Sequence, residues 1–574
     1  MINITINNNK LSVPEGTTIL NAAKSIGIEI PTLCYHPDQQ IKASCRVCVV
    51  EVAGSRTLQT ACSTPVTEGM IVKTNTEKVR KARKACLELL LSDHDADCVS
   101  CTKNLNCELQ KLAMQSGIRE NIFESILDEK EIDTSSPSLV RNPNKCIKCG
   151  RCIEMCKEVQ GLNIIDYAGR GHDTVITPAF GKYLSDAACV ACGQCSVVCP
   201  VAAITEKEDI DLVWEAIDNP KKHVVVQTAP AVRVSIGEEF GLEPGSIVTG
   251  KLVAGLRKLG FDKVFDTDFT ADLTIIEEGN ELIERIKTGG TLPMMTSCSP
   301  GWINYIEQYY PELLDHVSTC KSPQQMFGAM AKTYYAEKIN VSPEDIVVVS
   351  IMPCTAKKFE CKRPEMSVDG KNPEVDVVLT TRELAKMFKQ AGLDIRTLPE
   401  EEYDAPFGIT TGAAVIFGAT GGVMEAALRT VYEVVTGKTL EKLDFTDVRG
   451  LEGIKESVVD LNGTKVKVAV AHSLVNAKKL LELIKSGKCD YTFIEVMCCP
   501  GGCIGGGGQP YGGTNEIKLK RIDATYQADR DLPLRKSHES PAVKAIYDEY
   551  LKQPLGEKSH KYLHTHYTNR KKAD

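Results

Sequence analysis

FIEVMCCPGGCIGGGGQP, residues Phe493 to Pro510, is the segment from which the rest of this chain is best understood. It begins with a mostly apolar run of strand type, Phe493 to Met497, and then turns sharply through two cysteines and a proline to Cys503. Four glycines at 505–508 follow, and without a Cβ they can pass close to a bulky inorganic group. This arrangement predicts one wall of a metal site, with a flexible loop beside buried cysteines as the alternative.

Cysteine is the residue type that stands out in the composition. The chain has 24 cysteines in 574 residues, and 16 of them lie between Cys34 and Cys199. Disulfides are disfavoured in a reducing cytoplasm, so thiols at this density indicate metal binding.

The rest of the composition is that of an ordinary multidomain protein. The length suits about four domains, and 43% hydrophobic residues allow a large core. The net charge of −8, from 68 basic and 76 acidic residues, favours neither nucleic acid nor an anionic membrane as partner. The first residues carry no secretory signal pattern, and no apolar run approaches the roughly 18 residues of a membrane span. We therefore expect a cytoplasmic protein.

The first predicted domain covers residues 1–78. Residues 2–13 alternate apolar and polar side chains as a hairpin does, and a helix capped by Thr17 or Thr18 follows. Four thiols come next, with a long gap, a close pair and a distant fourth. This spacing resembles the 2Fe-2S ferredoxins of the plant and complex I types, which have a β-grasp fold; zinc is the alternative for the close pair. The predicted ligands are Cys34, Cys45, Cys48 and Cys62.

The second predicted domain, residues 79–120, begins within a helix expected over residues 77–92. One histidine and three cysteines follow it, and this set of ligand types also suits tetrahedral zinc. After a 2Fe-2S domain, however, it resembles the histidine-ligated 4Fe-4S segment of complex I. The predicted ligands are His94, Cys98, Cys101 and Cys107.

The third predicted domain, residues 121–209, carries two matching runs of four cysteines, the second followed by Pro200. This is the pattern of two-cluster bacterial ferredoxins, in which the fourth cysteine of each run ligates the cluster of the other run. We therefore assign one 4Fe-4S cluster to Cys146, Cys149, Cys152 and Cys199, and the second to Cys156, Cys189, Cys192 and Cys195.

The fourth predicted domain, residues 210–574, has few cysteines and alternates strand-like runs with helical patterns. This rhythm predicts α/β units with largely parallel sheets, which bind ligands at the carboxyl ends of their strands. Three strands end at thiols, and we expect those ends to converge on one site. The predicted strands are 224–227, 264–265, 292–295, 346–351, 375–379, 466–470 and 493–497, and the thiols are Cys298, Cys354 and the pair Cys498 and Cys499.

The three thiol-bearing segments read TSCSPGW from Thr296, MPCTAKKFE from Met352, and the segment quoted first. They resemble the three motifs of the iron-only (di-iron) hydrogenases, usually TSCCPxW, MPCxxKxxE and ExMACxxGCxxGGGxP. The resemblance covers nearly the whole chain, because the accessory cluster motifs also follow the order of the large multi-cluster members. It implies a multidomain α+β and α/β protein with the catalytic H-cluster between two lobes of the C-terminal domain.

The resemblance also implies roles for individual residues. Cys354, Cys499 and Cys503 match ligands of the 4Fe-4S cubane of the H-cluster, and Cys503 matches the bridge to a di-iron subsite that carries carbonyl, cyanide and azadithiolate. Lys357 matches a donor to a cyanide, although alone it reads as a surface lysine. Residues matching those packed around the subsite are Pro230, Pro323, Gln324, Met352, Phe417 and Met497.

The resemblance implies a proton route as well. Cys298 matches the thiol beside the distal iron, and the route continues to the surface through Glu278, Ser318 and Glu281, with Arg285 near its exit. Thiols and carboxylates relay protons only within hydrogen-bond or single-water reach. From the residues alone, the same helical glutamates read as a solvated face with an i,i+4 ion pair.

Two positions depart from the family motifs. Ser299 stands where most relatives have the cysteine that ligates the cubane, and Cys498 stands where they have alanine. We predict that Ser299 occupies the ligand position while Cys298 keeps the proton role. The rival hypothesis makes Cys298 the ligand and leaves proton delivery to Cys498 or water.

Phrases such as ASCRVCVVEV and SHKYLHTHY resemble catalytic subunits of multimeric, often electron-bifurcating, NAD(P)-coupled hydrogenases. No dinucleotide-binding GxGxxG motif in a strand-to-helix context occurs here, so flavin and NAD(P) are expected on partner subunits, with ferredoxin as a further partner. A free-standing ferredoxin-dependent hydrogenase, a hydrogen or redox sensor with little turnover, and a complex I-like electron-transfer scaffold are the alternatives.

Overall fold

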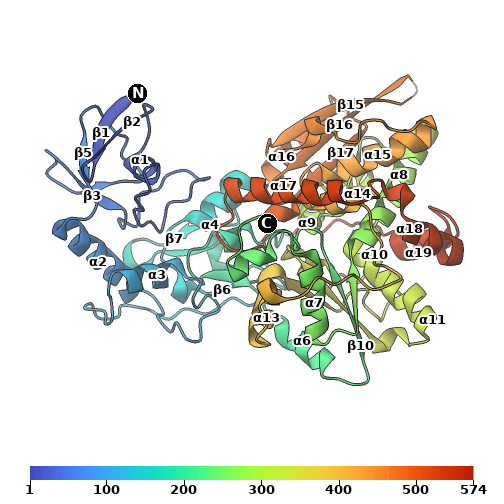
Figure 1. The fold of residues 1–574 in the computed structure, drawn as a ribbon, viewed down its shortest axis with the longest axis horizontal. Helices are drawn as coiled ribbons and strands as arrows, with labels where there is room; N and C mark the ends of the chain where they lie inside the picture. Colours follow the sequence, from blue (N-terminus) through green and yellow to red (C-terminus); the bar gives the residue numbers. More distant parts are fainter. Residues whose placement is uncertain (462, 573–574) are drawn as a thin grey trace.

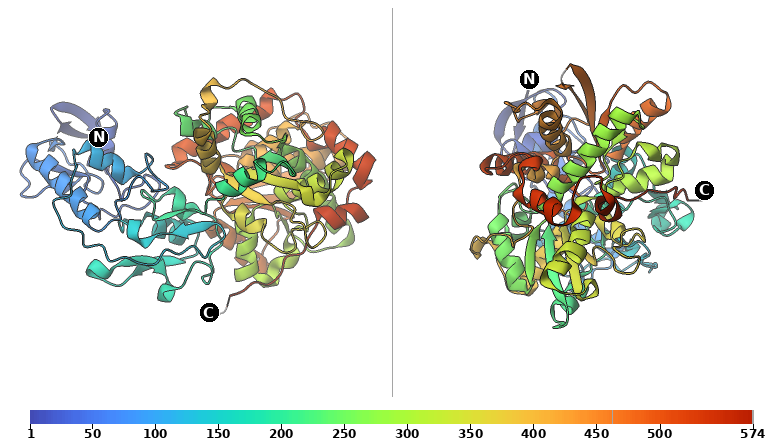
Figure 2. Two further views of the ribbon diagram at one scale, coloured as in Figure 1. Left: turned by 90° about the horizontal axis from the view of Figure 1, so that it is seen from below. Right: turned by 90° about the vertical axis from the view of Figure 1, so that its right-hand side faces the viewer.

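The computed structural model describes residues 1–461 and 463–572. Figure 1 shows the N-terminal iron-sulfur-type regions (blue to cyan) as an arm at one end of the molecule. The larger C-terminal region (green to red) forms the body at the other end. The same separation is visible from below in Figure 2.

The N-terminal domain is built on a five-stranded sheet in the order β2-β1-β5-β3-β4. Strand β1 pairs antiparallel with β2 and parallel with β5, and the predicted hairpin is confirmed. Helix α1 packs on the sheet after the Thr18 hydroxyl caps the Asn21 amide, and it ends at Lys24. The bounds are β1 Ile2–Ile6, β2 Asn9–Val13, α1 Ile19–Lys24, β3 Val49–Val52, β4 Gln59–Thr60 and β5 Ile71–Lys73.

The regions between residues 79 and 209 contain short elements between long loops that carry the thiols. Two cysteine runs each lead into a short helix that begins after a glycine in the left-handed region, Gly150 (φ 74°) and Gly193 (φ 68°). This repeated geometry reflects the repeat seen in the sequence. The bounds are α2 Glu77–Ser92, α3 Glu108–Gln115, β6 Leu139–Arg141, α4 Arg151–Glu154, β7 Ile165–Ala168, β8 Val175–Pro178, α5 Gln194–Val197 and β9 Ile204–Glu206.

The first lobe of the C-terminal region is a parallel sheet in the order β11-β10-β13-β14. Its two central strands, β10 and β13, are rich in valine and isoleucine, and nearly all their residues are buried, as parallel strands between helices must be. The predicted parallel arrangement is confirmed here. The bounds are α6 Ile210–Ile217, β10 His223–Thr228, α7 Thr249–Leu259, β11 Lys263–Asp266, α10 Pro323–Met330, β13 Ile346–Met352, β14 Val377–Thr380 and α13 Thr381–Gln390.

The second lobe has the strand order β12-β17-β16-β15. Strand β15 pairs antiparallel with β16, so the sequence patterns missed one strand that forms a hairpin edge on an otherwise parallel sheet. Helix α8 contacts α10 of the first lobe and α15 of the second. The bounds are α8 Asp268–Thr288, β12 Met294–Met295, α9 Pro300–Tyr309, α15 Gly422–Thr436, β15 Ile454–Leu461, β16 Thr464–His472, α16 Leu474–Lys485 and β17 Phe493–Met497.

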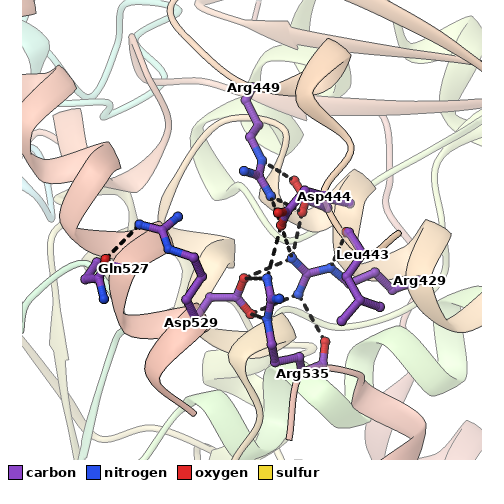
Figure 3. Close-up of polar contacts among 9 residues, drawn as sticks. Arg429, Leu443, Asp444, Arg449, Gln527, Asp529 and Arg535 are labelled. Carbon is purple, nitrogen blue, oxygen red and sulfur yellow. Dashed lines mark hydrogen bonds and ion pairs between the residues drawn. The ribbon is translucent and has the colours of Figure 1, made fainter. Parts of the chain in front are cut away.

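The C-terminal helices α17 (Asn515–Asp531), α18 (Pro541–Ile546) and α19 (Glu557–Leu563) pack back onto both lobes. A cluster of buried charges joins α17 to α15, as Figure 3 shows. The Arg429 guanidinium donates to both oxygens of Asp529 at 2.9 Å. Among the described helices, none has the length and apolar character that crossing a membrane requires.

Candidate active site

Three strand ends meet at one cavity between the two lobes, as the sequence predicted. Strand β13 leads to Cys354, β12 leads to Cys298, and β17 leads directly into the CCPGGC turn. Because all three strands present their carboxyl ends to the same space, their thiols share it. The cysteines that line the cavity are Cys192, Cys298, Cys354, Cys498, Cys499 and Cys503.

The predicted packing residues form the remaining walls of this cavity. All six of them line it, together with Ser299 and Lys357; the six are Pro230, Pro323, Gln324, Met352, Phe417 and Met497. The Gln324 side-chain oxygen is buried without a hydrogen-bond partner in the part of the chain that the structure describes. A mostly apolar pocket with thiols and a few polar groups suits a bound inorganic cofactor.

Lys357 is buried, so its reading as a surface lysine is wrong. Its ammonium donates to the Glu360 carboxylate at 2.8 Å and to the Cys298 carbonyl at 3.2 Å. Glu360 also accepts from Ser322 and Gln324, at 2.9 and 3.2 Å. The sequence assigned no role to Glu360, although its i,i+3 spacing from Lys357 in MPCTAKKFE was the available signal.

The two glutamates of the predicted proton route lie on a buried face of α8, and Ser318 lies against them from a neighbouring segment. Glu278 and Glu281 are 3% and 7% exposed, so the reading of this face as solvated is wrong. The Ser318 hydroxyl donates to Glu281 at 2.9 Å, and Arg285 donates to the other Glu281 oxygen at 2.6 Å. Glu278 interacts with the Ser318 side chain. The predicted i,i+4 ion pair between Glu281 and Arg285 is therefore present within a buried chain of polar groups.

The electrostatics of the inner part of the route favour protonated groups. Burial, reinforced by the nearby Glu281 charge, raises the pKa of Glu278 to about 8. Burial also raises the pKa of the Cys298 thiol well above its ordinary value, and the neighbouring Glu278 adds to this shift. Near neutral pH both groups therefore hold a proton.

A second set of polar residues continues from Glu281, and the sequence did not identify it. The Thr319 hydroxyl lies 3.2 Å from Glu281 and 2.8 Å from the His564 Nδ1 atom. His564 Nε2 lies 3.2 Å from Glu277. These contacts join residues far apart in the chain, so no local pattern could have indicated them.

The four thiols predicted to bind the 2Fe-2S cluster lie together in the N-terminal domain. The Cys48 and Cys62 sulfur atoms are 3.4 Å apart, and the Cys34 and Cys45 side chains form a second interacting pair. The charges of Cys34 and Cys45 also act on Cys62, which brings the two pairs into one group. The structure thus gathers this predicted ligand set.

His94 lies in an environment that suits a metal ligand. Its Nδ1 atom is buried and has no hydrogen-bond partner among residues 1–461 and 463–572. Burial, with the positive charge of Lys145, lowers the pKa of His94 to about 4 and keeps the ring neutral. The charge of Cys101 acts on both Cys98 and Cys107, and Lys145 lies near both His94 and Cys98. These interactions place the four predicted ligands in one region.

The fourth cysteine of each matching run lies with the first three cysteines of the other run, as the bacterial ferredoxin pattern predicted. One pocket is lined by the first group, and the members of the second group act on one another electrostatically. The first group is Cys146, Cys149, Cys152 and Cys199, and the second is Cys156, Cys189, Cys192 and Cys195. Cys192 of the second group also lines the cavity between the lobes, a connection that the sequence did not reveal.

The glycine run packs closely against neighbouring loops. We predicted that Gly505 to Gly508 let the backbone approach a cofactor, and of these four Gly506 lines the cavity. A Cβ on Gly507 would lie 2.2 Å from the Cys192 carbonyl oxygen, and one on Gly506 would lie 2.0 Å from that of Pro353. The glycines are therefore needed for close packing against the backbones of neighbouring loops.

Comparison with protein families identifies the class of protein to which this architecture belongs. Residues 222–507 match the iron only hydrogenase large subunit, C-terminal domain, and residues 515–570 match the iron hydrogenase small subunit. Upstream, residues 1–77 match a 2Fe-2S iron-sulfur cluster binding domain, and 83–121 match the NADH-ubiquinone oxidoreductase-G iron-sulfur binding region. Residues 145–203 match a 4Fe-4S dicluster domain. The chain belongs to the iron-only hydrogenase family and is an oxidoreductase with iron-sulfur domains.

Similar proteins extend over the full length of the chain. The NADP-reducing hydrogenase subunit HndD of Solidesulfovibrio fructosivorans is 52% identical, with all of both chains covered. Iron hydrogenase 1 of Clostridium pasteurianum is 42% identical over 99% of this chain and 100% of its own. A solved structure of a variant of the apo [FeFe]-hydrogenase HydA1 from Chlamydomonas reinhardtii is 46% identical with a TM-score of 0.57, covering 62% of this chain and 99% of that one. The predicted family and fold class are confirmed.

The donors around the cavity fit the group that this family carries. Thiolates are the ligands that iron-sulfur clusters require, and several are gathered here. The buried Lys357 ammonium can balance the charge of an anionic cofactor, which would otherwise be costly in an apolar site. The unpartnered Gln324 oxygen is a polar atom available to a bound group.

Proposed function

We propose that this protein catalyses the reversible reaction 2H⁺ + 2e⁻ ⇌ H₂ at an H-cluster held in the cavity between the lobes. The observation that carries the proposal is the meeting of three features at one place. The cavity holds the thiols of three strand ends, it adjoins Cys192 of the ferredoxin-like region, and a buried chain of proton-carrying groups leads away from it. An electron-transfer scaffold without chemistry of its own needs no such proton path.

When bound, the H-cluster supplies the metal site at which protons and electrons combine. Of the chain's own residues, Cys354, Cys499 and Cys503 would hold it, and the six packing residues would exclude water. Lys357, fixed by Glu360, would provide a positive hydrogen-bond donor. We assign the boundaries 78, 120 and 209 to the accessory domains as part of this proposal.

In the proposed proton route, Cys298 holds a proton at its Sγ atom, and Glu278 exchanges it at a carboxylate oxygen. Ser318 and Glu281 continue the exchange toward Arg285, whose side chain is partly exposed. Proton transfer through such groups requires hydrogen-bond or single-water distances at each step. The 2.9 Å contact from Ser318 to Glu281 meets this requirement.

In the proposed electron route, four accessory clusters lie between partners and the cavity. The 2Fe-2S cluster and the histidine-ligated 4Fe-4S cluster would exchange electrons with partners, and the paired 4Fe-4S clusters would pass them inward. The position of Cys192, in the second cluster's thiol group and on the cavity wall, supports this order. A reducing compartment keeps so many thiols available for iron-sulfur clusters, which favours a cytoplasmic location.

Infrared spectroscopy of the fully maturated protein tests the proposal most directly. We expect absorption bands of metal-bound carbonyl and cyanide, and H₂ evolution from a reduced viologen dye. Bands without turnover would support the sensor alternative. The absence of both would contradict the hydrogenase proposal and leave an electron-transfer role.

We further propose that the chain works as the catalytic subunit of a complex with flavin- and NAD(P)-binding subunits and a ferredoxin-like subunit, with ferredoxin as a second redox partner. Full-length similarity to a relative described as an NADP-reducing hydrogenase subunit supports this proposal. Affinity purification from the native cells should retain a flavoprotein and show H₂-dependent reduction of NAD⁺ or NADP⁺. Coupled reduction of ferredoxin in the same assay would indicate bifurcation. A fully active single chain that accepts only ferredoxin would favour the free-standing alternative.

A further inference from the structure

The cavity contains a thiol that the proposed ligand set does not use. Cys354, Cys499 and Cys503 supply three thiols, whereas a 4Fe-4S cubane takes four ligands. The usual fourth position of the family motif is occupied by Ser299. Cys498 is buried in the same wall.

Cys498 and Ser299 lie against each other although they are 199 residues apart in the chain. The Cys498 backbone amide donates to the Ser299 hydroxyl oxygen at 3.2 Å. The Cys498 sulfur points at the start of α9, which Ser299 precedes, because a Cβ built on Gly301 would lie 2.8 Å from that sulfur. The thiol thus reaches the turn from which the missing cysteine would project.

The thiols around Cys498 define which cluster it can serve. Its side chain interacts with Cys192 on one side and with Cys499 on the other. Cys192 belongs to a group that already has four thiols, so a fifth is superfluous there. Cys499 belongs to a group with three, where one ligand is lacking.

The chemistry of the two candidate donors also differs. A thiolate is a soft ligand that iron-sulfur clusters prefer, whereas a serine oxygen is harder and much less readily deprotonated. The Ser299 hydroxyl oxygen is moreover engaged by the Cys498 amide. Cys298 suits proton transfer better than ligation. Its carbonyl accepts a hydrogen bond from Lys357, and its thiol lies beside Glu278.

We propose that Cys498 supplies the fourth thiolate of the cubane, so that the two departures from the family motifs compensate each other. This inference rests on the proposed function, because it requires a cubane in the cavity. It differs from the sequence-based prediction of Ser299 as the ligand, which becomes an outcome of the test. Cys298 keeps its role in proton transfer.

The test uses the full chain with its iron-sulfur clusters assembled but without the di-iron subsite, so that activity plays no part. Iron per chain and the electron paramagnetic resonance spectrum of the reduced protein are measured for five variants. Cys498→Ala should lose about four iron atoms per chain and the cubane signal. Cys354→Ala, the positive control, should lose the same. Ser299→Ala and Cys298→Ala should each keep both, and the exchanged variant Ser299→Cys/Cys498→Ala should recover both.

Two other patterns of cluster loss would overturn the inference. Cluster loss in Ser299→Ala with retention in Cys498→Ala would make serine the ligand. Retention in both, with loss in Cys298→Ala, would make Cys298 the ligand. Circular dichroism of the 2Fe-2S cluster must stay unchanged in Cys498→Ala, and recovery in the exchanged variant separates ligand loss from misfolding. If the parent protein and Cys354→Ala carry equal iron and identical spectra, the cavity holds no cubane and the proposed function fails instead.

Discussion

Replacing Glu278 by glutamine should lower the rates of H₂ evolution and oxidation by about 10²–10⁴-fold. The carboxyl group lies between the Cys298 thiol and the Ser318–Glu281 pair, and an amide cannot take up and release a proton there. Turnover with a reduced dye, measured across pH, gives the readout. Glu284→Gln on the exposed side of the same helix is the matched control and should retain full activity. Equal rates for Glu278→Gln and the parent would remove Glu278 from the route.

The same substitution should not harm folding. Because the pKa of Glu278 is raised to about 8 in the folded protein, its contribution to stability is fully present below the unfolded pKa near 4.5. That contribution is lost as the pH rises through about 8. Glutamine remains neutral at every pH, so the variant should gain thermal stability relative to the parent as the pH is raised from about 5 to about 9. A gain toward low pH would show the opposite sign and contradict the raised pKa.

Replacing Asp529 by alanine should destabilise the C-terminal region by about 3–5 kcal/mol, because it removes one of the two carboxylates that pair with the buried Arg429 guanidinium. Arg429 and Asp529 side chains are both 0% exposed, and Arg535 also donates to Asp529 at 2.6 Å. Figure 3 shows these groups converging between α15 and α17. The Arg429 guanidinium also donates to Glu425 at 2.6 Å, but Glu425 cannot satisfy all the donors of the guanidinium.

The measurement is the thermal unfolding transition of the C-terminal region, followed by near-ultraviolet circular dichroism. Asp523→Ala, an exposed position on the same helix, is the control and should change the unfolding free energy by less than about 0.5 kcal/mol. An unchanged transition in Asp529→Ala would mean that the ion cluster does not hold α17 in place.

The sequence revealed features that depend on residues close together in the chain. Cysteine spacing gave the accessory ligand groups, because loops that wrap a cluster hold their thiols a few residues apart. Strand ends such as Met352 and Met497, each followed within two residues by a cysteine, predicted the cavity because parallel strands share one functional edge. Family resemblance supplied the packing residues, including Pro230 and Phe417, which no local pattern singles out.

Features that depend on contacts between distant segments were missed. The pairs Cys498 with Ser299, and Thr319 with His564, are made only when separate elements come together. The burial of Glu281 could not be predicted from its helix, because the residues three and four positions away on either side are all charged and the covering residues come from other segments. The edge strand β15 was missed because it mixes charged and apolar residues, as a half-exposed strand does.

The contact between the glycine run and the Cys192 loop bears on how this protein can be divided. Gln194 donates to the Gly505 carbonyl at 2.8 Å, and Gln160 donates to the Cys498 carbonyl at 3.1 Å. The predicted boundary at residue 209 therefore separates two sequence motifs whose residues pack together in one wall of the cavity. A fragment that starts at residue 210 would lack Cys192 and open the cavity to solvent on that side. A fragment designed to keep these contacts should therefore include the ferredoxin-like region.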